Sequence, residues 1–150
     1  LVCLVGSEMC IRDRDYDPSI PEINGDENLF VQAILNIVKN SQQAMENSEN
    51  PLITIKSRIQ HGRPINGKIH QTVCCIDITD NGPGIPKDLH DQVFFPMVSV
   101  KENGSGLGLT IAQDIIRIHG GGLNFKSKPG ETTFSIFIPM KIESKEVKIA

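Results

Sequence analysis

The chain has 150 residues, of which 39% are hydrophobic and 22% are charged, and its formal net charge is −3. These values are typical of a single globular domain with a real core, and the weak negative charge argues against a nucleic-acid partner. The longest apolar runs are far shorter than a membrane span, so we expect this segment to make no membrane contact. No Cys or His spacing indicates zinc, and the four cysteines are expected to be free thiols in a reducing cytoplasm.

The first 14 residues, LVCLVGSEMCIRDR, show neither helical nor strand periodicity. They resemble adapter-derived translation, and we expect them to be a non-native or disordered tail. Residues 15–23 contain two prolines and are expected to enter the domain as extended chain. We therefore expect the folded domain to cover residues 15–141 and the charged residues 142–150 to fray.

Apolar residues recur at helical spacing after Asp26, which has the chemistry of an N-cap, and they predict a helix from Glu27 to Glu46. Asn36 and Asn40 are four residues apart and share one face of that helix, close to its apolar stripe. Asparagine is a poor helix former. The pair is therefore either merely solvated or a set of amide oxygens directed at a cation or a phosphate.

Two strands are expected next. Leu52–Ile59 alternates in the manner of a half-exposed strand, and Val73–Thr79 is a short β-branched run typical of a buried one. Residues 61–71 between them are expected to form a hairpin-like loop, which is too short for a crossover helix, so the strands should be antiparallel.

The buried strand leads directly into Asp80-Asn81-Gly82-Pro83-Gly84. One interpretation is a simple turn, because Asp-Asn-Gly favours turns by itself. The other is that Asp80 accepts a hydrogen bond from a ligand amine, while Gly82 and Gly84 let the backbone approach that ligand closely. We expect a short helix over Lys87–Val93 after this loop, and then an apolar cluster, Phe94–Met97, outside regular structure.

A second glycine loop, Gly104–Leu109, leads into a predicted helix that ends before Gly120. Free backbone N–H groups at such a helix start favour phosphate, and Lys101 adds a cation just upstream. The spacing GxGxG fits neither a P-loop nor a dinucleotide-binding loop. Two last strands, Leu123–Ser127 and Thr132–Pro139, are expected around a Pro-Gly turn.

The order of these parts resembles the catalytic, ATP-binding domain of sensor histidine kinases, within the GHKL superfamily shared with gyrase, Hsp90 and MutL. LNIVKNSQQAM is similar to the N box, DNGPGIP to the G1 box, VFFPM to the F box and GSGLGL to the G2 box. The resemblance implies the Bergerat fold, an α/β (α+β) two-layer sandwich. Helices would cover one face of a mixed, mostly antiparallel sheet and leave the other open to solvent or a partner.

The resemblance also implies roles for single residues. Asp80 would accept the adenine amino group, helped by the hydroxyl of Thr133. Asn40 would bind Mg²⁺, Asn36 would lie close to the phosphates and the metal, and Lys101 would contact a phosphate, which makes these three the catalytic set. The remaining implied nucleotide contacts are Gly82, Gly84, Gly104, Ser105, Gly106, Leu107, Gly108 and Leu109. Phe94 and Phe95 would anchor the glycine-rich lid.

An amide at Asn36 bears on the reaction. Hydrolytic members of the superfamily typically hold a glutamate there to activate water, and an amide cannot act as a general base. The resemblance therefore implies that the γ-phosphoryl group of ATP passes to a histidine, and then to an aspartate on a response regulator. That histidine would lie on a dimerisation domain that this chain lacks, because none of its four histidines lies on a suitable helix.

RDYDPSIPE, FFPMVS and IVKNSQQAM are most like the nitrogen-regulation sensor kinases (NtrB-like). That likeness implies an NtrC-like response regulator and a PII signalling protein as partners. Two alternatives stay open from the sequence. One is a serine-directed protein kinase of the same superfamily, and the other is a nucleotide-responsive switch module without catalysis.

Overall fold

The structure is a computed structural model of the chain, and it describes residues 2–3, 10–20, 23–96 and 106–140. Its elements in chain order are β1 Val2–Cys3, β2 Cys10–Tyr16, α1 Glu27–Ala44, β3 Leu52–Ile65, β4 Lys68–Asp80, the 3-10 helix η1 Lys87–Gln92, α2 Gly108–Ile118, β5 Gly122–Lys128 and β6 Glu131–Pro139. No helix within these described residues is long and apolar enough to cross a membrane.

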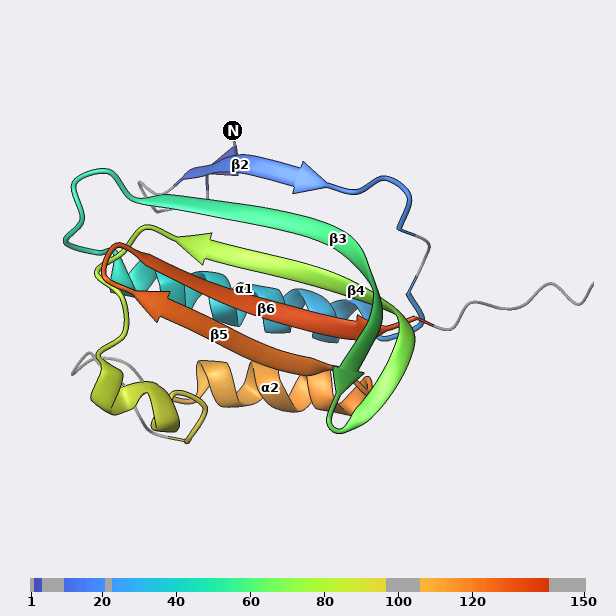
Figure 1. Cartoon of the computed structure of the whole chain (residues 1–150). Coiled ribbons are helices and arrows are strands. Elements are labelled where there is room, and N and C mark those ends of the chain that lie inside the picture. The colour runs from blue at the N-terminus through green and yellow to red at the C-terminus, as the bar shows by residue number, and fades with distance from the viewer. Residues whose placement is uncertain (1, 4–9, 21–22, 97–105, 141–150) are drawn as a thin grey trace, which may run out of the picture.

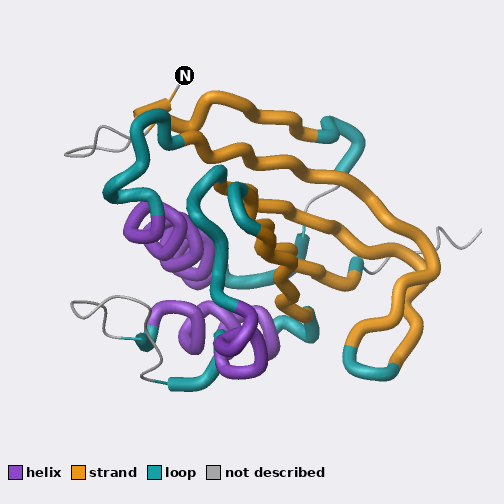
Figure 2. Tube along the Cα trace, turned by 60° about the vertical axis from the view of Figure 1, so that its left-hand side comes forward, coloured by secondary structure: helices purple, strands orange, loops and turns teal. Residues whose placement is uncertain are grey.

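The elements form two layers (Figures 1 and 2). The strands make one six-stranded sheet in the order β1-β2-β3-β4-β6-β5, in which only the β2–β3 pair is parallel among the described strands. α1 and α2 lie side by side on one face of this sheet. The predicted two-layer sandwich with a mixed, mostly antiparallel sheet is confirmed.

α1 begins where the sequence predicts. The Asp26 carboxylate accepts hydrogen bonds from the backbone N–H groups of Asn28 and Leu29, at 3.0 and 3.2 Å, so it is the N-cap. The helix ends at Ala44, two residues before the predicted Glu46. Its apolar stripe, which includes Ile37 and Val38, is buried in the main core between the helices and the sheet.

The hairpin formed by β3 and β4 is longer than predicted. The expected loop over residues 61–71 is wrong, because both strands continue to a tight turn at Asn66-Gly67. These two residues have φ values of +50° and +81°, and asparagine and glycine are the residues that tolerate a two-residue turn of this hand. The predicted antiparallel pairing of the two strands is confirmed.

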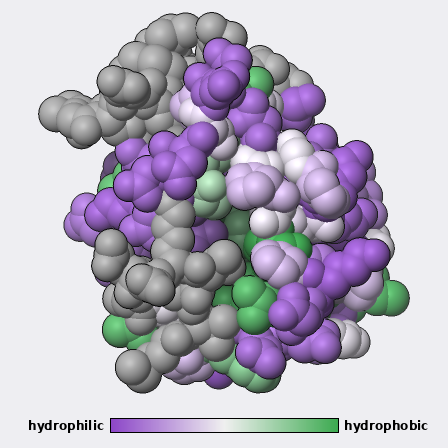
Figure 3. All heavy atoms as spheres, turned by 90° about the vertical axis from the view of Figure 1, so that its left-hand side faces the viewer, coloured by the Kyte–Doolittle hydropathy of each residue, from purple (hydrophilic) through white to green (hydrophobic). Residues whose placement is uncertain are grey.

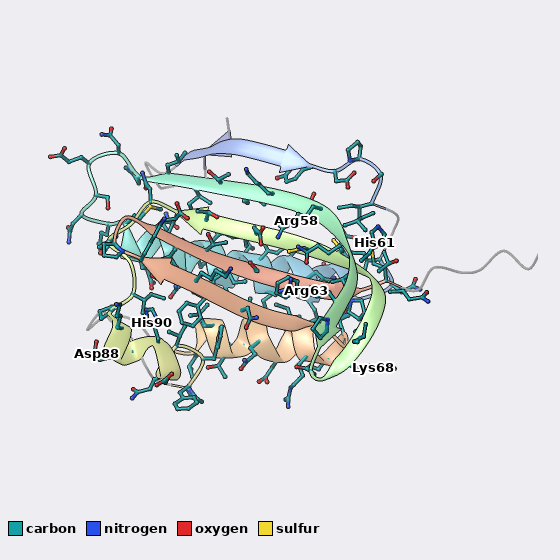
Figure 4. The ribbon with its side chains drawn as sticks, viewed as in Figure 1. Arg58, His61, Arg63, Lys68, Asp88 and His90 are labelled. Carbon is teal, nitrogen blue, oxygen red and sulfur yellow. The ribbon has the colours of Figure 1, made fainter. Side chains whose placement is uncertain are left out.

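The tip of this hairpin folds over the sheet face that points away from the helices (Figure 1). Ile65 from the tip, together with Val73, Cys75 and Phe137, forms a second small core there, and the Arg63 guanidinium stacks 3.7 Å from the Phe137 ring. The expectation of an open face is therefore wrong at this end. Figure 4 shows Arg58 and Arg63 in front of the sheet, on the side opposite the helices.

The N-terminal segment also differs from expectation. Residues 10–14, expected to lie outside the domain, form with Asp15 and Tyr16 the strand β2, which pairs with β3. Without β2, the edge of β3 would present unpaired backbone N–H and C=O groups, and an extended segment of almost any sequence can form hydrogen bonds with them. That residues 1–14 are foreign to the natural protein stays a prediction, and residues 1, 4–9 and 141–150 lie outside the described part.

Candidate functional site

A cleft of about 1160 Å³ opens at one end of the molecule. Its walls are the second half of α1 with the loop that follows, the loop after β4, parts of η1, and the start of α2. Figure 3 faces this end of the molecule and shows hydrophobic side chains near its middle, with hydrophilic ones around them.

α1 brings both predicted asparagines to the cleft. Asn36 and Asn40 line it, and the Nδ2 atom of Asn36 is buried without a hydrogen-bond partner among the described residues. Lys39, Gln43 and Asn47 line it as well. None of these three was predicted from the sequence, although Gln43 and Asn47 continue the helical spacing of Asn36 and Asn40.

Asp80, the last residue of β4, is only 3% exposed. Burial raises the pKa of its carboxyl group, and the backbone N–H of Gly82, which donates to Oδ1 at 3.0 Å, only partly opposes that rise. The nearby Ser41 hydroxyl also lowers this pKa, although it does not reach hydrogen-bond geometry with the carboxyl. Asp80 thus lies directly behind Gly82, which lines the cleft.

A second acidic residue on β4, Asp77, has a structural role and allows a comparison with Asp80. Asp77 lies on the opposite face, where it accepts a hydrogen bond from the Ser135 hydroxyl at 2.6 Å and pairs with Arg58. Burial would raise the pKa of Asp77, but these two partners together lower it. Asp80 has no such cationic partner among the described residues, which is the condition expected of a carboxylate that meets a ligand.

The two glycines after Asp80 are required by the protein itself. A Cβ on Gly82 would lie 3.0 Å from both Asp80 Oδ1 and Met45 Cγ. Gly84 has φ +88°, and a Cβ there would lie 2.6 Å from the carbonyl oxygen of Lys128. Both glycines also line the cleft, so the loop packs against Met45 and Lys128 on one side and faces the cleft on the other.

Two side chains fasten this loop on either side. Asn81 accepts a hydrogen bond from the Leu52 backbone N–H at 2.9 Å and donates to the Asn50 carbonyl at 2.8 Å. Ser127 of β5 accepts from the Ile85 backbone N–H at 2.7 Å. Neither role was predicted from the sequence, because both side chains contact segments that are far apart in the chain.

The register of β6 corrects one predicted residue. Asp80 pairs across the strands with Thr132, whereas Thr133 pairs with Thr79 on the other face, with their hydroxyls 2.8 Å apart. Thr132 is 3% exposed and therefore takes the position beside Asp80 that was expected for Thr133. Strand alternation could have revealed this, because Thr132 shares its face with the apolar Phe134, Ile136 and Ile138, whereas Thr133 shares its face with Ser135.

The start of α2 closes the cleft opposite α1. Gly106, Leu107, Gly108 and Leu109 line it, and a Cβ on Gly108 would come within 3.9 Å of Asn36 Cβ. Lys101, Gly104 and Ser105 lie outside the described residues.

The two phenylalanines before this loop differ in their surroundings. Phe94 packs on Phe125 and Phe134, with ring centroids 5.8 and 6.4 Å apart, and its carbonyl accepts from the Thr110 hydroxyl at 3.2 Å. Phe95 is 58% exposed. Phe94 thus ties the segment to the core, and the role of both rings as lid anchors stays a prediction.

Comparison with known proteins assigns the chain to a family. Residues 25–142 match the family model described as histidine kinase-, DNA gyrase B- and HSP90-like ATPase. The chain belongs to this family. It is an ATP-binding catalytic domain of the histidine kinase type.

Its curated relatives are longer proteins. The chain is 46% identical over 140 residues to the sensory histidine kinase/phosphatase NtrB of Vibrio alginolyticus, covering 93% of this chain and 40% of that protein. It is 34% identical over 135 residues to the NtrB of Azospirillum brasilense, covering 87% of this chain and 33% of that protein. The chain therefore spans about 40% or less of the length of these two relatives.

Solved structures agree on the fold. The nucleotide-free catalytic domain of the histidine kinase ThkA superposes with a TM-score of 0.69 at 26% identity, covering 87% of this chain and 78% of that one. The mycobacterial sensor histidine kinase MprB gives the same TM-score at 24% identity, covering 85% and 81%, and that likeness concerns the fold alone.

In this histidine kinase domain, residues predicted from distant parts of the sequence meet at one cleft. Asn36, Asn40, Gly82, Gly84 and the residues from Gly106 to Leu109 line it, and Asp80 lies behind Gly82. Thr133 is the predicted residue whose side chain lies on the wrong side of the sheet.

Proposed function

We propose that this domain binds ATP with Mg²⁺ in the cleft and donates the γ-phosphoryl group to a histidine on a dimerisation domain outside this chain. One observation carries the proposal. A buried carboxylate without a cationic partner lies behind one wall of the cleft, and two amides one helical turn apart line another. A nucleotide has matching ends, an amino-bearing base and an anionic, metal-binding triphosphate.

The base would bind beside Asp80. A carboxylate is purely an acceptor and suits the exocyclic amino group of adenine. Thr132, its cross-strand neighbour, supplies a hydroxyl on the same face. Gly82 and Gly84 let the loop pack closely against Met45 and Lys128, which holds its backbone in the wall where the base would bind.

The phosphates would bind between α1 and the start of α2. The unpartnered Nδ2 of Asn36 is a donor that fits a phosphate oxygen, and Lys39 brings a cation to the same wall. The amide oxygen of Asn40 fits Mg²⁺, which takes oxygen ligands and is held in proteins mainly through the phosphates and one or two side chains. Lys101, Gly104 and Ser105 would add contacts from the lid.

Transfer is favoured over hydrolysis by the side chain at Asn36. An amide cannot activate water as a general base, whereas phosphoryl transfer to a protein nucleophile depends mainly on positioning and charge neutralisation. The relatives carry names that describe histidine kinase/phosphatases. The first point supports transfer to a protein side chain, and the second supports a histidine rather than a serine as the acceptor, with onward transfer to an aspartate on a response regulator.

The kinship with NtrB proteins supports a finer proposal, a role in nitrogen regulation with an NtrC-like response regulator and a PII signalling protein as partners. Cys74 and Cys75 are buried free thiols, and burial raises the pKa of Cys75 to about 12. Free thiols fit a reducing compartment, so we place the protein in the cytoplasm.

Two measurements test the proposal. The first is the ATP affinity of the chain with and without Mg²⁺. Parent protein should bind more tightly with the metal, and Asn40→Ala should remove most of that difference. Gln32→Ala, an exposed change on the same helix and outside the cleft lining, is the matched control. Equal Mg²⁺ dependence in Asn40→Ala and the control would contradict the metal role.

The second measurement supplies a separate dimerisation domain with its histidine. Acid-labile phosphohistidine should form on that domain in the presence of ATP, and the chain alone should not phosphorylate itself appreciably. Acid-stable phosphoserine would instead favour a serine-directed kinase. ATP binding without transfer to either residue would favour a nucleotide-responsive switch.

A further inference from the structure

Three polar side chains form one row across three adjacent strands, behind the loop that lines the cleft with Gly82, Gly84 and Ile85. Asp80 of β4 pairs with Thr132 of β6, and Thr132 pairs with Ser127 of β5. All three lie on the helix-covered face, because Ile78, Phe134 and Phe125 on the same strands, each two residues away, pack in the main core. The row therefore runs from a carboxylate through two hydroxyls.

The hydrogen bonds along this row have a fixed direction at one end. The Ile85 backbone N–H lies 2.7 Å from Ser127 Oγ and can only donate, so Ser127 Oγ is the acceptor there. The hydroxyl of Ser127 lies 2.8 Å from that of Thr132. When Ser127 directs its own proton to Thr132, it accepts one hydrogen bond and donates another, and the two bonds strengthen each other.

This direction leaves the Thr132 proton free to point away from Ser127, toward the side on which Asp80 lies. The row then ends in a donor, the Thr132 hydroxyl, next to an acceptor, the Asp80 carboxylate. If Thr132 instead donated to Ser127, the Thr132 proton would not be available to a ligand beside Asp80. The Ile85 amide occupies one lone pair of Ser127 Oγ, and this polarises the Ser127 hydroxyl and favours the arrangement in which it donates onward to Thr132.

We propose that Ser127 is a positioning residue for base selectivity, which acts by orienting the Thr132 hydroxyl as a donor beside Asp80. An acceptor next to a donor complements the edge of adenine, which has an amino donor beside a ring-nitrogen acceptor. It opposes the guanine edge, which has a carbonyl acceptor beside a ring N–H donor. This inference rests on the proposed binding of ATP and adds the residue that makes the site reject GTP.

Ser127 also affects where Asp80 lies relative to the Thr132 hydroxyl. Its bond to Ile85 holds the loop that begins at Asp80, and the Gly84 backbone in that loop already lies against Lys128, the residue after Ser127. The donor and the acceptor are therefore fixed relative to each other by one side chain. Loss of the Ser127 hydroxyl should affect recognition of the base and leave the metal-dependent part of binding intact.

The test compares ATP and GTP affinities, each with Mg²⁺, for the parent chain and Ser127→Ala. We expect ATP binding to weaken about 3- to 10-fold, the value of one neutral hydrogen bond, while GTP binding stays the same or improves. Ser127→Thr keeps the hydroxyl and should restore the parent ratio. Ser135→Ala removes a hydroxyl from the same hairpin on the opposite face, and its ATP-to-GTP ratio should match the parent's.

A purely structural role for Ser127 would weaken ATP and GTP binding together, and that result would overturn the proposal. Should Ser127→Ala be too unstable to measure, Ser127→Cys keeps the volume with a much weaker hydrogen-bonding group and must show the same fall in the ratio. A parent chain without measurable ATP affinity would refute the proposed function itself. A parent that prefers ATP, with Ser127→Ala equally selective, would refute the inference about Ser127 alone.

Discussion

Replacement of Asp80 by asparagine separates two roles of this carboxylate, which are to accept the hydrogen bond from the Gly82 N–H and to carry a negative charge. Asp80 is 3% exposed, and burial raises its pKa, so the ionised group is unfavourable in the folded protein without a ligand. Asparagine keeps an oxygen that can accept from the Gly82 N–H, which Asp80 Oδ1 accepts at 3.0 Å. The loop should therefore keep its shape while the charge is lost.

Binding should suffer although stability does not. A hydrogen bond to a charged group contributes about 1.5–3 kcal/mol, so Asp80→Asn should weaken ATP binding about 10- to 150-fold. The amide also offers an N–H₂ donor, which suits the carbonyl of guanine, so the preference for ATP over GTP should largely disappear. Titration calorimetry with both nucleotides measures this, and the free energy of unfolding at pH 7 should be no lower than that of the parent.

The pH dependence follows from the direction of the pKa shift. Because the folded-state pKa of Asp80 lies above the unfolded-state value, the folded state binds this proton first as pH falls. The stability contributed by this group thus rises as pH decreases through that interval, and the stability difference between parent and Asp80→Asn should shrink there. ATP affinity should fall over the same interval in the parent only. An unchanged ATP preference in a folded Asp80→Asn protein would refute this reasoning.

Two further predictions use matched pairs. Gly84→Ala and Gly130→Ala both place alanine at φ +88°, which costs about 1–2 kcal/mol in each variant. Only the Gly84 Cβ would also meet a backbone carbonyl, at 2.6 Å. Urea unfolding should therefore show that Gly84→Ala loses roughly 1–3 kcal/mol more stability than Gly130→Ala does. Equal losses would mean that the contact with Lys128 is unimportant. Thr132→Val should weaken ATP binding about 3- to 10-fold in a fluorescence-displacement assay, whereas Thr133→Val, which alters the opposite face, should bind as the parent does. The reverse outcome would restore Thr133 to the site.

Sequence patterns predicted the elements well where one signal dominated. The Asp26 cap and the apolar stripe of α1 placed that helix within two residues at its end, because its capping and burial are local properties of the chain. The β3–β4 hairpin was predicted too short, since residues 61–71, which contain Gly62 and Pro64, were expected to form a loop. The strands continue past both residues to the turn at Asn66-Gly67.

In the site, too, local features were predictable from the sequence and long-range contacts were not. The pair Asn36 and Asn40, the acid at the end of a strand and the two glycine loops were recognisable in order along the chain, because each depends on local spacing. Ser127 and Asn81 were not, since their partners at Ile85 and Leu52 are 42 and 29 residues away. A single side chain's importance becomes visible only when the segment that it holds is in place.

By itself, the amino-acid sequence determined the family, the two-layer architecture and part of the cleft lining, namely Asn36 and Asn40 on α1 and several residues of the two glycine loops. Only the tertiary structure decided that Thr132 rather than Thr133 lies beside Asp80, and that Ser127 continues that row. The reason is physical. Adjacent strand residues point to opposite faces, and the register between β6 and β4, which joins segments far apart in the chain, decides which threonine lies beside Asp80.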